Sequence, residues 1–378
     1  MTDSTIIINN IAYPFNDGET ILDVARTHHI EIPTLCYLEG TATTGGCGLC
    51  VVEIKGEKDL FNACTTIAAK NMVILTRSHR VITERKIRII HLLESGNHNC
   101  SIGASQGTSW TAFQMSSIHS GDSDVLCPRW GECELQNLAY EYQVQWNRKP
   151  GFDLPPVKKE TVNPLIVRDF SRCILCGRCV AACNEIQVNQ AIRMPEEAEP
   201  KQIIAGQKGR ALKDSNCVFC GECVQACPVG ALVEQKVSHQ CRPWAVEKIR
   251  TTCPYCGVGC QIWLHVKDGK ILKASGVKEG APNKGRLCVK GRFGYDFIYS
   301  DERLTSPLIK ENGTFRPATW DEALDLVSEK FKTIIAESGP DALAGVSCAR
   351  SINEDSYQMQ KLFRSVFKTN NIDHCART

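Results

Sequence analysis

The chain has 378 residues, with 44 Lys and Arg against 42 Asp and Glu, so its formal net charge is only +2. This balance gives no reason to predict a nucleic-acid or membrane-surface partner, and no run reaches the ~18 apolar residues of a membrane span. The 22 cysteines follow an N-terminus, MTDSTIIINN, that shows no export signal. Such cysteine use is typical of a reducing compartment. We therefore expect a cytoplasmic protein that uses its thiols for metals.

Residues 1–80 combine short strands with a cysteine loop. Strands are predicted at 5–8 and 11–15 and a helix at 21–26, and the Gly-rich loop that follows lets the backbone wrap closely around a ligand. Its four cysteines have the spacing C-x10-C-x2-C-x13-C: Cys36, Cys47, Cys50 and Cys64. Four thiolates on such a loop favour a [2Fe–2S] cluster, and a zinc loop is the alternative. The loop resembles the variant β-grasp ferredoxin domain at the start of complex I's large iron–sulfur subunit and of iron-only hydrogenases.

Residues 81–146 contain a histidine and three cysteines: His98, Cys100, Cys127 and Cys133. They resemble the His-plus-three-Cys [4Fe–4S] domain of the same two families, whose usual pattern is H-x3-C-x2-C-x5-C. The sequence departs from it twice, because the His-to-Cys spacing is shorter and a Ser/Gly-rich insertion follows Cys100. Alignment on Cys100 puts Gly96 at the family's histidine. We predict His98 as the fourth ligand, with His91 or a missing ligand as alternatives.

A helix and a linker flank this cysteine set. The linker is predicted at 147–164, where the chain contains several Pro and Lys residues. The helix is predicted between residues 80 and 95, with one apolar face: Val81, Ile82, Ile87, Ile90 and Leu93.

Residues 165–240 hold two copies of C-x2-C-x2-C-x3-C, the spacing of bacterial two-cluster ferredoxins. In that pattern three close thiolates hold one [4Fe–4S] cluster and the fourth reaches the other cluster. The two predicted ligand sets are Cys173, Cys176, Cys179 with Cys227, and Cys217, Cys220, Cys223 with Cys183. Helices are expected after Cys179 and Cys223 and a strand after Cys227. Structural zinc or disulfides are the alternatives, but zinc ribbons usually pair two C-x2-C knuckles across a longer gap.

Residues 248–303 begin a new pattern, CPYCGVGC, with a fourth cysteine after a long gap. The gap contains a predicted hairpin, in which 261–266 and 271–275 flank an Asp-Gly turn, so the last cysteine can return to the first three. The set is Cys253, Cys256, Cys260 and Cys288. Taken by themselves, these cysteines could equally bind zinc.

CPYCGVGC and the later GRLCVKGRFGYDFIYSDERLTSPLIK resemble the entry to the molybdopterin oxidoreductase family, in particular its cytoplasmic formate dehydrogenases. The resemblance implies a [4Fe–4S] cluster on these four cysteines. It also implies that the lysine two residues after the last cysteine, Lys290, is an electron bridge between cluster and pterin. Without this context Lys290 would be interpreted as an ordinary surface lysine.

Residues 304–378 show a β/α alternation. A helix is predicted from Thr319, with a possible capping box to Glu322 and an apolar stripe. A strand at 343–346 and a helix at 353–367 follow, and we expect an incomplete α/β domain, because a single strand cannot form a parallel sheet. In formate dehydrogenases a segment like TNNIDHCART directly precedes the metal-ligating selenocysteine or cysteine. The resemblance therefore implies truncation at a selenocysteine codon after Thr378.

Three cysteines are left outside the predicted sets, and each is expected to be a small buried side chain: Cys241, Cys348 and Cys375. Cys375 lies a few residues too early to be the family's metal ligand and is interpreted as its neighbour.

The predicted fold is an α+β multidomain protein with one [2Fe–2S] and four [4Fe–4S] clusters. The resemblance implies the catalytic subunit of a formate dehydrogenase, which converts formate to CO2 at molybdenum or tungsten held by bis-molybdopterin guanine dinucleotide. A flavin-containing NAD(P) diaphorase-type subunit, a ferredoxin or a hydrogenase subunit would receive the electrons. The alternatives are an electron-transfer subunit of a complex I-like or hydrogenase assembly, or another molybdopterin enzyme such as a nitrate reductase. We expect the 378-residue chain alone to be inactive with formate.

Overall fold

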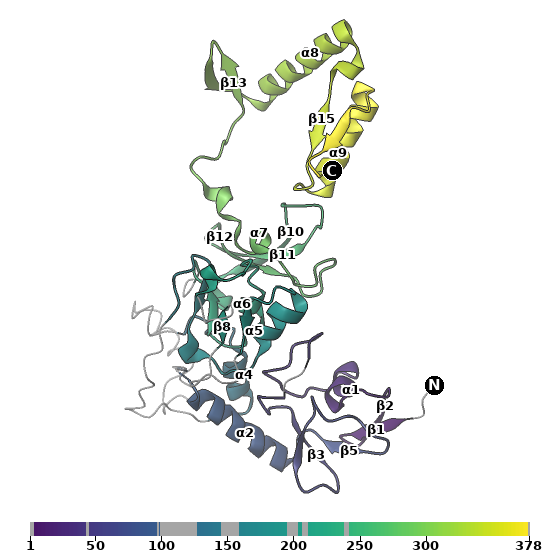
Figure 1. The fold of residues 1–378 in the computed structure, drawn as a ribbon, viewed down its shortest axis with the longest axis vertical. Coiled ribbons are helices and arrows are strands. Elements are labelled where there is room, and N and C mark those ends of the chain that lie inside the picture. Colours follow the sequence, from purple (N-terminus) through teal and green to yellow (C-terminus); the bar gives the residue numbers. More distant parts are fainter. Residues whose placement is uncertain are drawn as a thin grey trace. The chain divides into compact units, whose positions relative to one another are not determined.

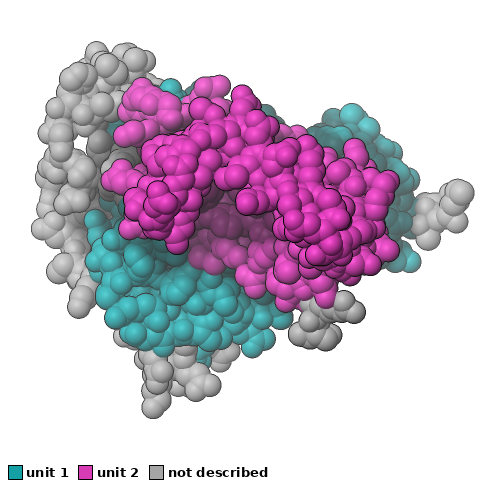
Figure 2. All heavy atoms as spheres, turned by 90° about the horizontal axis from the view of Figure 1, so that it is seen from above, with its two compact units in different colours: residues 1–246 teal, residues 247–378 magenta. Residues whose placement is uncertain are grey.

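The computed structural model describes residues 4–42, 45–96, 98, 127–144, 159–194, 203–205, 211–237 and 242–376. The chain forms two compact units, Met1–Val246 and Glu247–Thr378 (Figure 2), and each is described by itself. Both mix helices with short strands (Figure 1), so the predicted α+β multidomain architecture is confirmed. Within the described ranges, no helix has the length and apolar character that crossing a membrane requires.

The first unit begins with a five-stranded sheet in the order β2-β1-β5-β3-β4, in which β1 and β5 are parallel and the other neighbours are antiparallel. Helix α1 (Ile21–Thr27) starts at a capping box between Thr20 and Asp23 and buries its apolar side chains in one core with the strands. The predicted strands and helix are confirmed to within a residue. The strands are β1 (Thr5–Ile8), β2 (Ile11–Pro14), β3 (Val51–Ile54), β4 (Leu60–Asn62) and β5 (Val73–Leu75).

Helix α2 (His79–Glu94) follows the sheet and contacts both β3 and helix α4 (Glu134–Glu141). The helix is where the sequence predicted it. The predicted apolar face is confirmed at Val81 and Leu93, which are buried, and wrong at Ile87, which is 42% exposed. The inward residues are spaced by four, which keeps them on one side of a helix with 3.6 residues per turn. They are Val81, Arg85, Ile89 and Leu93.

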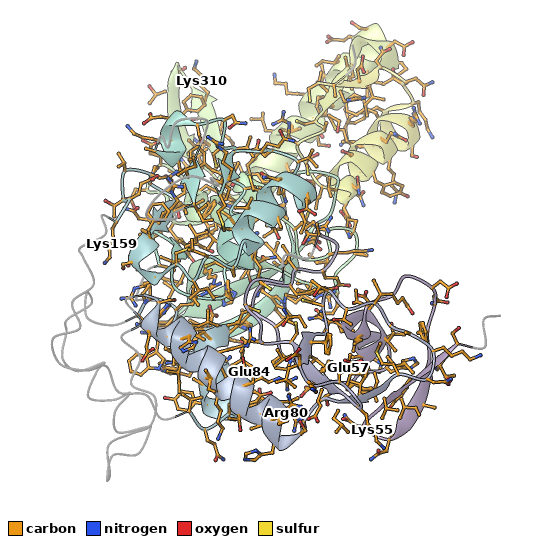
Figure 3. The ribbon with its side chains drawn as sticks, turned by 60° about the horizontal axis from the view of Figure 1, so that its bottom comes forward. Lys55, Glu57, Arg80, Glu84, Lys159 and Lys310 are labelled. Atoms are coloured by element: carbon orange, nitrogen blue, oxygen red, sulfur yellow. The ribbon has the colours of Figure 1, made fainter. Side chains whose placement is uncertain are left out.

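The start of α2 is tied to the β3–β4 segment. Arg80 donates to the Lys58 carbonyl oxygen at 2.6 Å and forms a 3.6 Å ion pair with Glu53. Figure 3 shows Arg80 and Glu84 on this helix and Lys55 and Glu57 on the segment between the strands. These contacts join the start of helix α2 to strand β3 and the turn that follows it.

The twin-cysteine region contains β6 (Ile166–Arg168) paired antiparallel with β9 (Leu232–Glu234), and β7 (Ile192–Arg193) paired with β8 (Ile204–Ala205). Its two motif copies use the same backbone conformations. Leu175 and Phe219 have φ of 53° and 52°, and Gly177 and Gly221 have φ of 77° and 74°. The repeat seen in the sequence is therefore also a repeat of the backbone.

Each of these glycines precedes a short helix, as predicted. Helix α5 (Arg178–Ala181) continues as a π-helical turn, Ala182–Ile186, that contains Cys183. Helix α6 (Glu222–Ala226) ends at Cys227, and β9 follows as the expected strand. The 3-10 helices of this unit are Phe170–Arg172, Leu212–Asp214 and Pro243–Ala245.

The second unit opens with a three-stranded antiparallel sheet, β10 (Glu247–Thr252), β11 (Gln261–Lys267) and β12 (Lys270–Gly276). The predicted hairpin is confirmed, with Asp268 and Gly269 at φ of 50° and 73° in its turn. Strand β10 was not predicted. Helix α7 (Val289–Phe293) packs against β12, and a 3-10 helix, Asp296–Tyr299, follows.

The remainder of the second unit holds the hairpin β13 (Leu308–Glu311) and β14 (Thr314–Pro317), then helix α8 (Trp320–Ser338). The Thr319 hydroxyl accepts from the Glu322 N–H at 3.2 Å, as predicted. The prediction of the reciprocal bond, from the Thr319 N–H to the Glu322 carboxylate, is wrong, because that carboxylate pairs with Arg316 instead.

The prediction of a single strand near the C-terminal end is also wrong. Strand β15 (Gly345–Ser347) pairs in parallel with β16 (Ile372–His374), which lies in the segment TNNIDHCART. A 3-10 turn, Pro340–Ala342, precedes β15. Between β15 and β16 the chain forms α9 (Asn353–Lys361), which continues as a π-helical stretch, Leu362–Phe367. Parallel pairing joins segments far apart in the sequence, which local patterns do not reveal.

Candidate metal centres

The loop of the first sheet brings its four predicted cysteines into one buried group: Cys36, Cys47, Cys50 and Cys64. The Leu35 N–H donates to Cys47 Sγ at 3.4 Å, and a hydrogen bond with Cys36 together with burial raises the pKa of Cys47. The sulfurs of Cys50 and Cys64 are 3.2 Å apart, and this hydrogen bond lowers the pKa of Cys50 to about 7. Four buried thiols with a backbone donor are a donor set that fits an iron–sulfur cluster.

Arg85 holds this loop, a role that no pattern in the sequence indicated. The side chain is fully buried. Its Nε donates to the Leu49 carbonyl oxygen at 3.0 Å and its Nη2 to that of Val51 at 2.7 Å, on either side of Cys50. Its Nη1 donates to the Tyr142 hydroxyl at 2.9 Å. One guanidinium therefore joins the cysteine loop, helix α2 and the end of α4.

His98 is buried, with 4% of its surface exposed, and its Nε2 has no hydrogen-bond partner among the described residues. Burial and the nearby Arg172 guanidinium lower its pKa to about 4, so the ring is neutral, which is the form that binds metals. The alternative ligand His91 is exposed on α2. Any side chain at Gly96 would lie 2.6 Å from the Ser171 carbonyl oxygen.

Two of the three cysteines predicted to accompany His98 lie within the described residues. Cys100 lies outside the described residues. Cys127 and Cys133 are both buried. The Cys127 carbonyl oxygen accepts from Arg242 at 2.9 Å. A Cβ built at Gly230 would lie 3.1 Å from the Cys127 sulfur and 3.5 Å from Cδ of Arg172. Arg172 therefore lies in the neighbourhood of both Cys127 and His98.

The first twin-motif set lines one enclosed apolar cavity of about 30 Å³: Cys173, Cys176, Cys179 and Cys227. Burial raises the pKa of Cys173 to about 11 and that of Cys176 to about 12, and in both cases the nearby Cys227 adds to the increase. The Leu175 N–H donates to Cys173 Sγ at 3.4 Å. The structure therefore brings Cys227 to the first motif copy, across the sequence.

The second set shows the reciprocal arrangement. Burial raises the pKa of Cys217 to about 11, and both Cys220 and Cys183 add to this increase. The Phe219 N–H donates to Cys217 Sγ at 3.4 Å, as Leu175 does in the first copy, and the Ala191 N–H donates to Cys183 Sγ at 3.3 Å. Cys223 lines the same cavity as the first set, so the two sets are neighbours.

In the second unit the CPYCGVGC segment and Cys288 come together. The Cys253 N–H donates to the Cys260 carbonyl at 2.8 Å. Burial raises the pKa of Cys253, and the nearby Cys288 and Cys256 add to the increase. The pKa of Cys260 is raised by burial and by the same neighbours. The hairpin therefore returns the fourth cysteine to the first three.

Lys290 lies in the first turn of α7, partly buried beside this set. Its Nζ is 5.5 Å from the centre of the Tyr255 ring, and its charge opposes the rise in the pKa of Cys253. Lys290, Cys253 and Tyr255 line one cavity of about 260 Å³. Lys290 is thus positioned next to the cysteine set rather than on open surface.

Two expectations about the remaining cysteines are wrong. Cys348 is only partly buried and Cys375 is exposed, and the two sulfurs lie 3.6 Å apart. Cys241 lies outside the described residues. In the ranges that the structure describes, no three His, Cys, Asp or Glu side chains converge on a position for a single metal ion.

Four family models match the chain. They are a 2Fe-2S iron-sulfur cluster binding domain at 3–79, a 4Fe-4S dicluster domain at 172–231, a molybdopterin oxidoreductase Fe4S4 domain at 246–300 and molybdopterin oxidoreductase at 303–378. The chain carries two domains of the molybdopterin oxidoreductase family. The predicted iron–sulfur and molybdopterin oxidoreductase domains are confirmed.

Relatives of the chain are longer than the chain itself. A "Putative formate dehydrogenase" of Staphylococcus aureus (strain USA300) is 31% identical over 405 aligned positions, which cover 97% of this chain and 38% of that protein. One of strain MRSA252 is 30% identical with the same coverage. The chain thus spans 38% of the length of these relatives. A crystal structure of an NAD+-reducing [NiFe]-hydrogenase matches with a TM-score of 0.50 and 25% identity, over 63% of this chain and 90% of that one.

Proposed function

We propose that this chain is the N-terminal, electron-transferring part of a formate dehydrogenase catalytic subunit. The reaction would convert formate to CO2, a proton and two electrons. The observation that carries the proposal is Lys290 beside the Cys253 set, within the region that matches the molybdopterin oxidoreductase Fe4S4 domain. The names of the relatives support formate as the substrate.

The proposed cluster ligands are the cysteine sets described above, with His98 joining Cys100, Cys127 and Cys133. This gives one [2Fe–2S] and four [4Fe–4S] clusters. Bound bis-molybdopterin guanine dinucleotide with molybdenum or tungsten would supply the oxidation of formate. We propose that its metal-ligating selenocysteine or cysteine belongs to the part of the full-length subunit outside residues 1–378, since the relatives are longer.

This chain's own residues would hold and insulate the electron path. Lys290 would be the electron bridge on the pterin side of the Cys253 set, with its ammonium near the Tyr255 ring. The apolar lining around Cys173 and Cys227 would exclude water from one twin cluster, which favours a defined potential. Cys223 lines the same cavity, so the second twin cluster would be next in the electron path.

We propose that electrons leave to a flavin-containing NAD(P) subunit, with a ferredoxin or a hydrogenase subunit as the other acceptors. The likeness to an NAD+-reducing hydrogenase over 63% of this chain supports this choice. That likeness also favours a second candidate function, an electron-transfer subunit of a hydrogenase assembly. In that case hydrogen and the hydrogenase partner, but not formate, would reduce the clusters.

The test is viologen-linked formate oxidation by the purified full-length subunit with its metal loaded. We expect activity with formate, and loss of most of it in Lys290→Gln with the cluster content unchanged. The 1–378 chain, with all clusters present, is the control and should be inactive. The proposal would be rejected if a fully loaded subunit did not oxidise formate but did oxidise another substrate or accept electrons from a hydrogenase.

A further inference from the structure

Two cysteines outside all the proposed cluster sets lie next to each other at one edge of the second unit. Strands β15 and β16 run parallel, with Ser347 paired with His374. Cys348 directly follows β15 and Cys375 directly follows β16. The fold therefore brings together two thiols that are 27 positions apart in the sequence. Their sulfurs are 3.6 Å apart.

The backbone geometry suits a covalent link between them. Neighbouring strands lie about 4.8 Å apart, within the roughly 4.4–6.8 Å between Cα atoms that disulfides span. The sulfurs would have to close from 3.6 Å to about 2.05 Å. The two side chains would have to rotate, and neither is held by deep burial, because Cys375 is exposed and Cys348 is only partly buried.

The surroundings favour the reactive, ionised form of the sulfurs. The Arg350 N–H donates to Cys348 Sγ at 3.3 Å. A hydrogen bond from the Ala349 backbone, the neighbouring Cys348 thiol and the Arg350 charge lower the pKa of Cys375. A thiolate is the attacking species in exchange with disulfides.

We propose that Cys348 and Cys375 form a reversible dithiol–disulfide site, oxidised by exchange with a small or protein-borne disulfide. The Cys375 thiolate attacks the oxidant's S–S bond, forms a mixed disulfide and releases one thiol. Cys348 then attacks the Cys375 sulfur, which forms the internal bond and releases the second thiol. The two protein thiols lose two electrons and two protons, and the oxidant disulfide gains them.

The link would fix the carboxyl ends of β15 and β16 to each other. Open α/β sheets bind their ligands at the carboxyl ends of their strands. If the proposed function is correct, the site would connect thiol oxidation to the edge of the cofactor-binding domain. The dithiol site itself does not depend on that function.

The cluster-loaded 1–378 chain, kept free of oxygen, is treated with oxidised glutathione, quenched with N-ethylmaleimide and digested with trypsin. Cleavage at Lys332, Arg350, Lys368 and Arg377 gives peptides 333–350 and 369–377, with one of the two cysteines in each. We expect a linked pair that is lighter than the sum of the two free peptides by two hydrogen atoms. Dithiothreitol should separate the pair, and the iron content should not change.

Cys348→Ser and Cys375→Ser are matched controls. Cys348→Ser should leave a stable glutathione adduct on Cys375, and neither variant should give the linked pair. The proposal is overturned if both wild-type peptides carry only N-ethylmaleimide, or if both carry glutathione without a link. The wild-type result stands even where a variant loses clusters. Because the readout uses no formate, its failure and failure of the proposed function can be told apart.

Discussion

Replacing Arg85 with methionine should destabilise the first cysteine loop while leaving every proposed ligand in place. The variant keeps an unbranched buried side chain but removes three hydrogen bonds, to the carbonyls of Leu49 and Val51 and to the Tyr142 hydroxyl. Hydrogen bonds that involve a charged group contribute about 1.5–3 kcal/mol each. The loss is partly offset, because burial of the guanidinium is itself unfavourable and lowers its pKa. We expect a net loss of about 3 kcal/mol in the free energy of unfolding.

The assay is urea unfolding of the cluster-loaded chain, followed by the visible circular dichroism of the [2Fe–2S] site. Arg80→Met is the matched control on the same helix, because Arg80 is exposed and bonds only to surface groups of the β3–β4 segment. Surface contacts of this kind contribute about 0.2–1 kcal/mol. Unfolding of both variants at the same urea concentration would refute the stabilising role of Arg85. Removal of a buried positive charge near Cys50 should also lower the reduction potential of this cluster.

Three further predictions concern the other sites. Gly276→Ala places a Cβ 1.9 Å from the Gly285 carbonyl oxygen. It should lower the free energy of unfolding by more than about 3 kcal/mol and remove the iron bound near Cys253. Gly313→Ala is the control, because its Cβ is strained but lies in open space, and it should keep the iron. His98→Ala should abolish the EPR signal of one [4Fe–4S] cluster and His98→Cys should restore one at a lower potential; unchanged spectra in both variants would exclude His98 as a ligand. Lys290→Gln in the full-length subunit should slow formate-driven reduction of the clusters at least tenfold without changing the KM for formate. An unchanged rate would show that Lys290 has no role in electron transfer.

The cysteine spacings predicted most of the site arrangement because cluster ligation imposes short, fixed intervals on the chain. The same spacing predicted that the last cysteine of each motif copy lies with the other copy. The structure brings Cys227 near Cys173 and Cys183 near Cys217, as expected. The Asp-Gly turn predicted the β11–β12 hairpin because few residues accept positive φ at two successive positions.

The features that the sequence did not predict depend on tertiary contacts. Arg85 lies on the inward face of α2, and a helical pattern that scores only apolar residues assigns such a position to solvent. Ile87 was assigned inward for the same reason and lies outward. The pairing of β15 with β16, and with it the meeting of Cys348 and Cys375, requires contacts across a helix. The half-formed cap of α8 reflects competition from Arg316, which local sequence rules do not include.

The most direct test of the account is reduction of the clusters by formate in a single turnover. The metal-loaded full-length subunit is mixed with formate without an acceptor, and the visible absorbance and EPR of its clusters are followed. We predict bleaching and reduced-cluster signals in the subunit, whereas the 1–378 chain is reduced by dithionite but not by formate. Clusters that stay oxidised in the loaded subunit with formate, yet accept electrons from dithionite, would contradict the proposed path from formate through Lys290 to the cysteine sites.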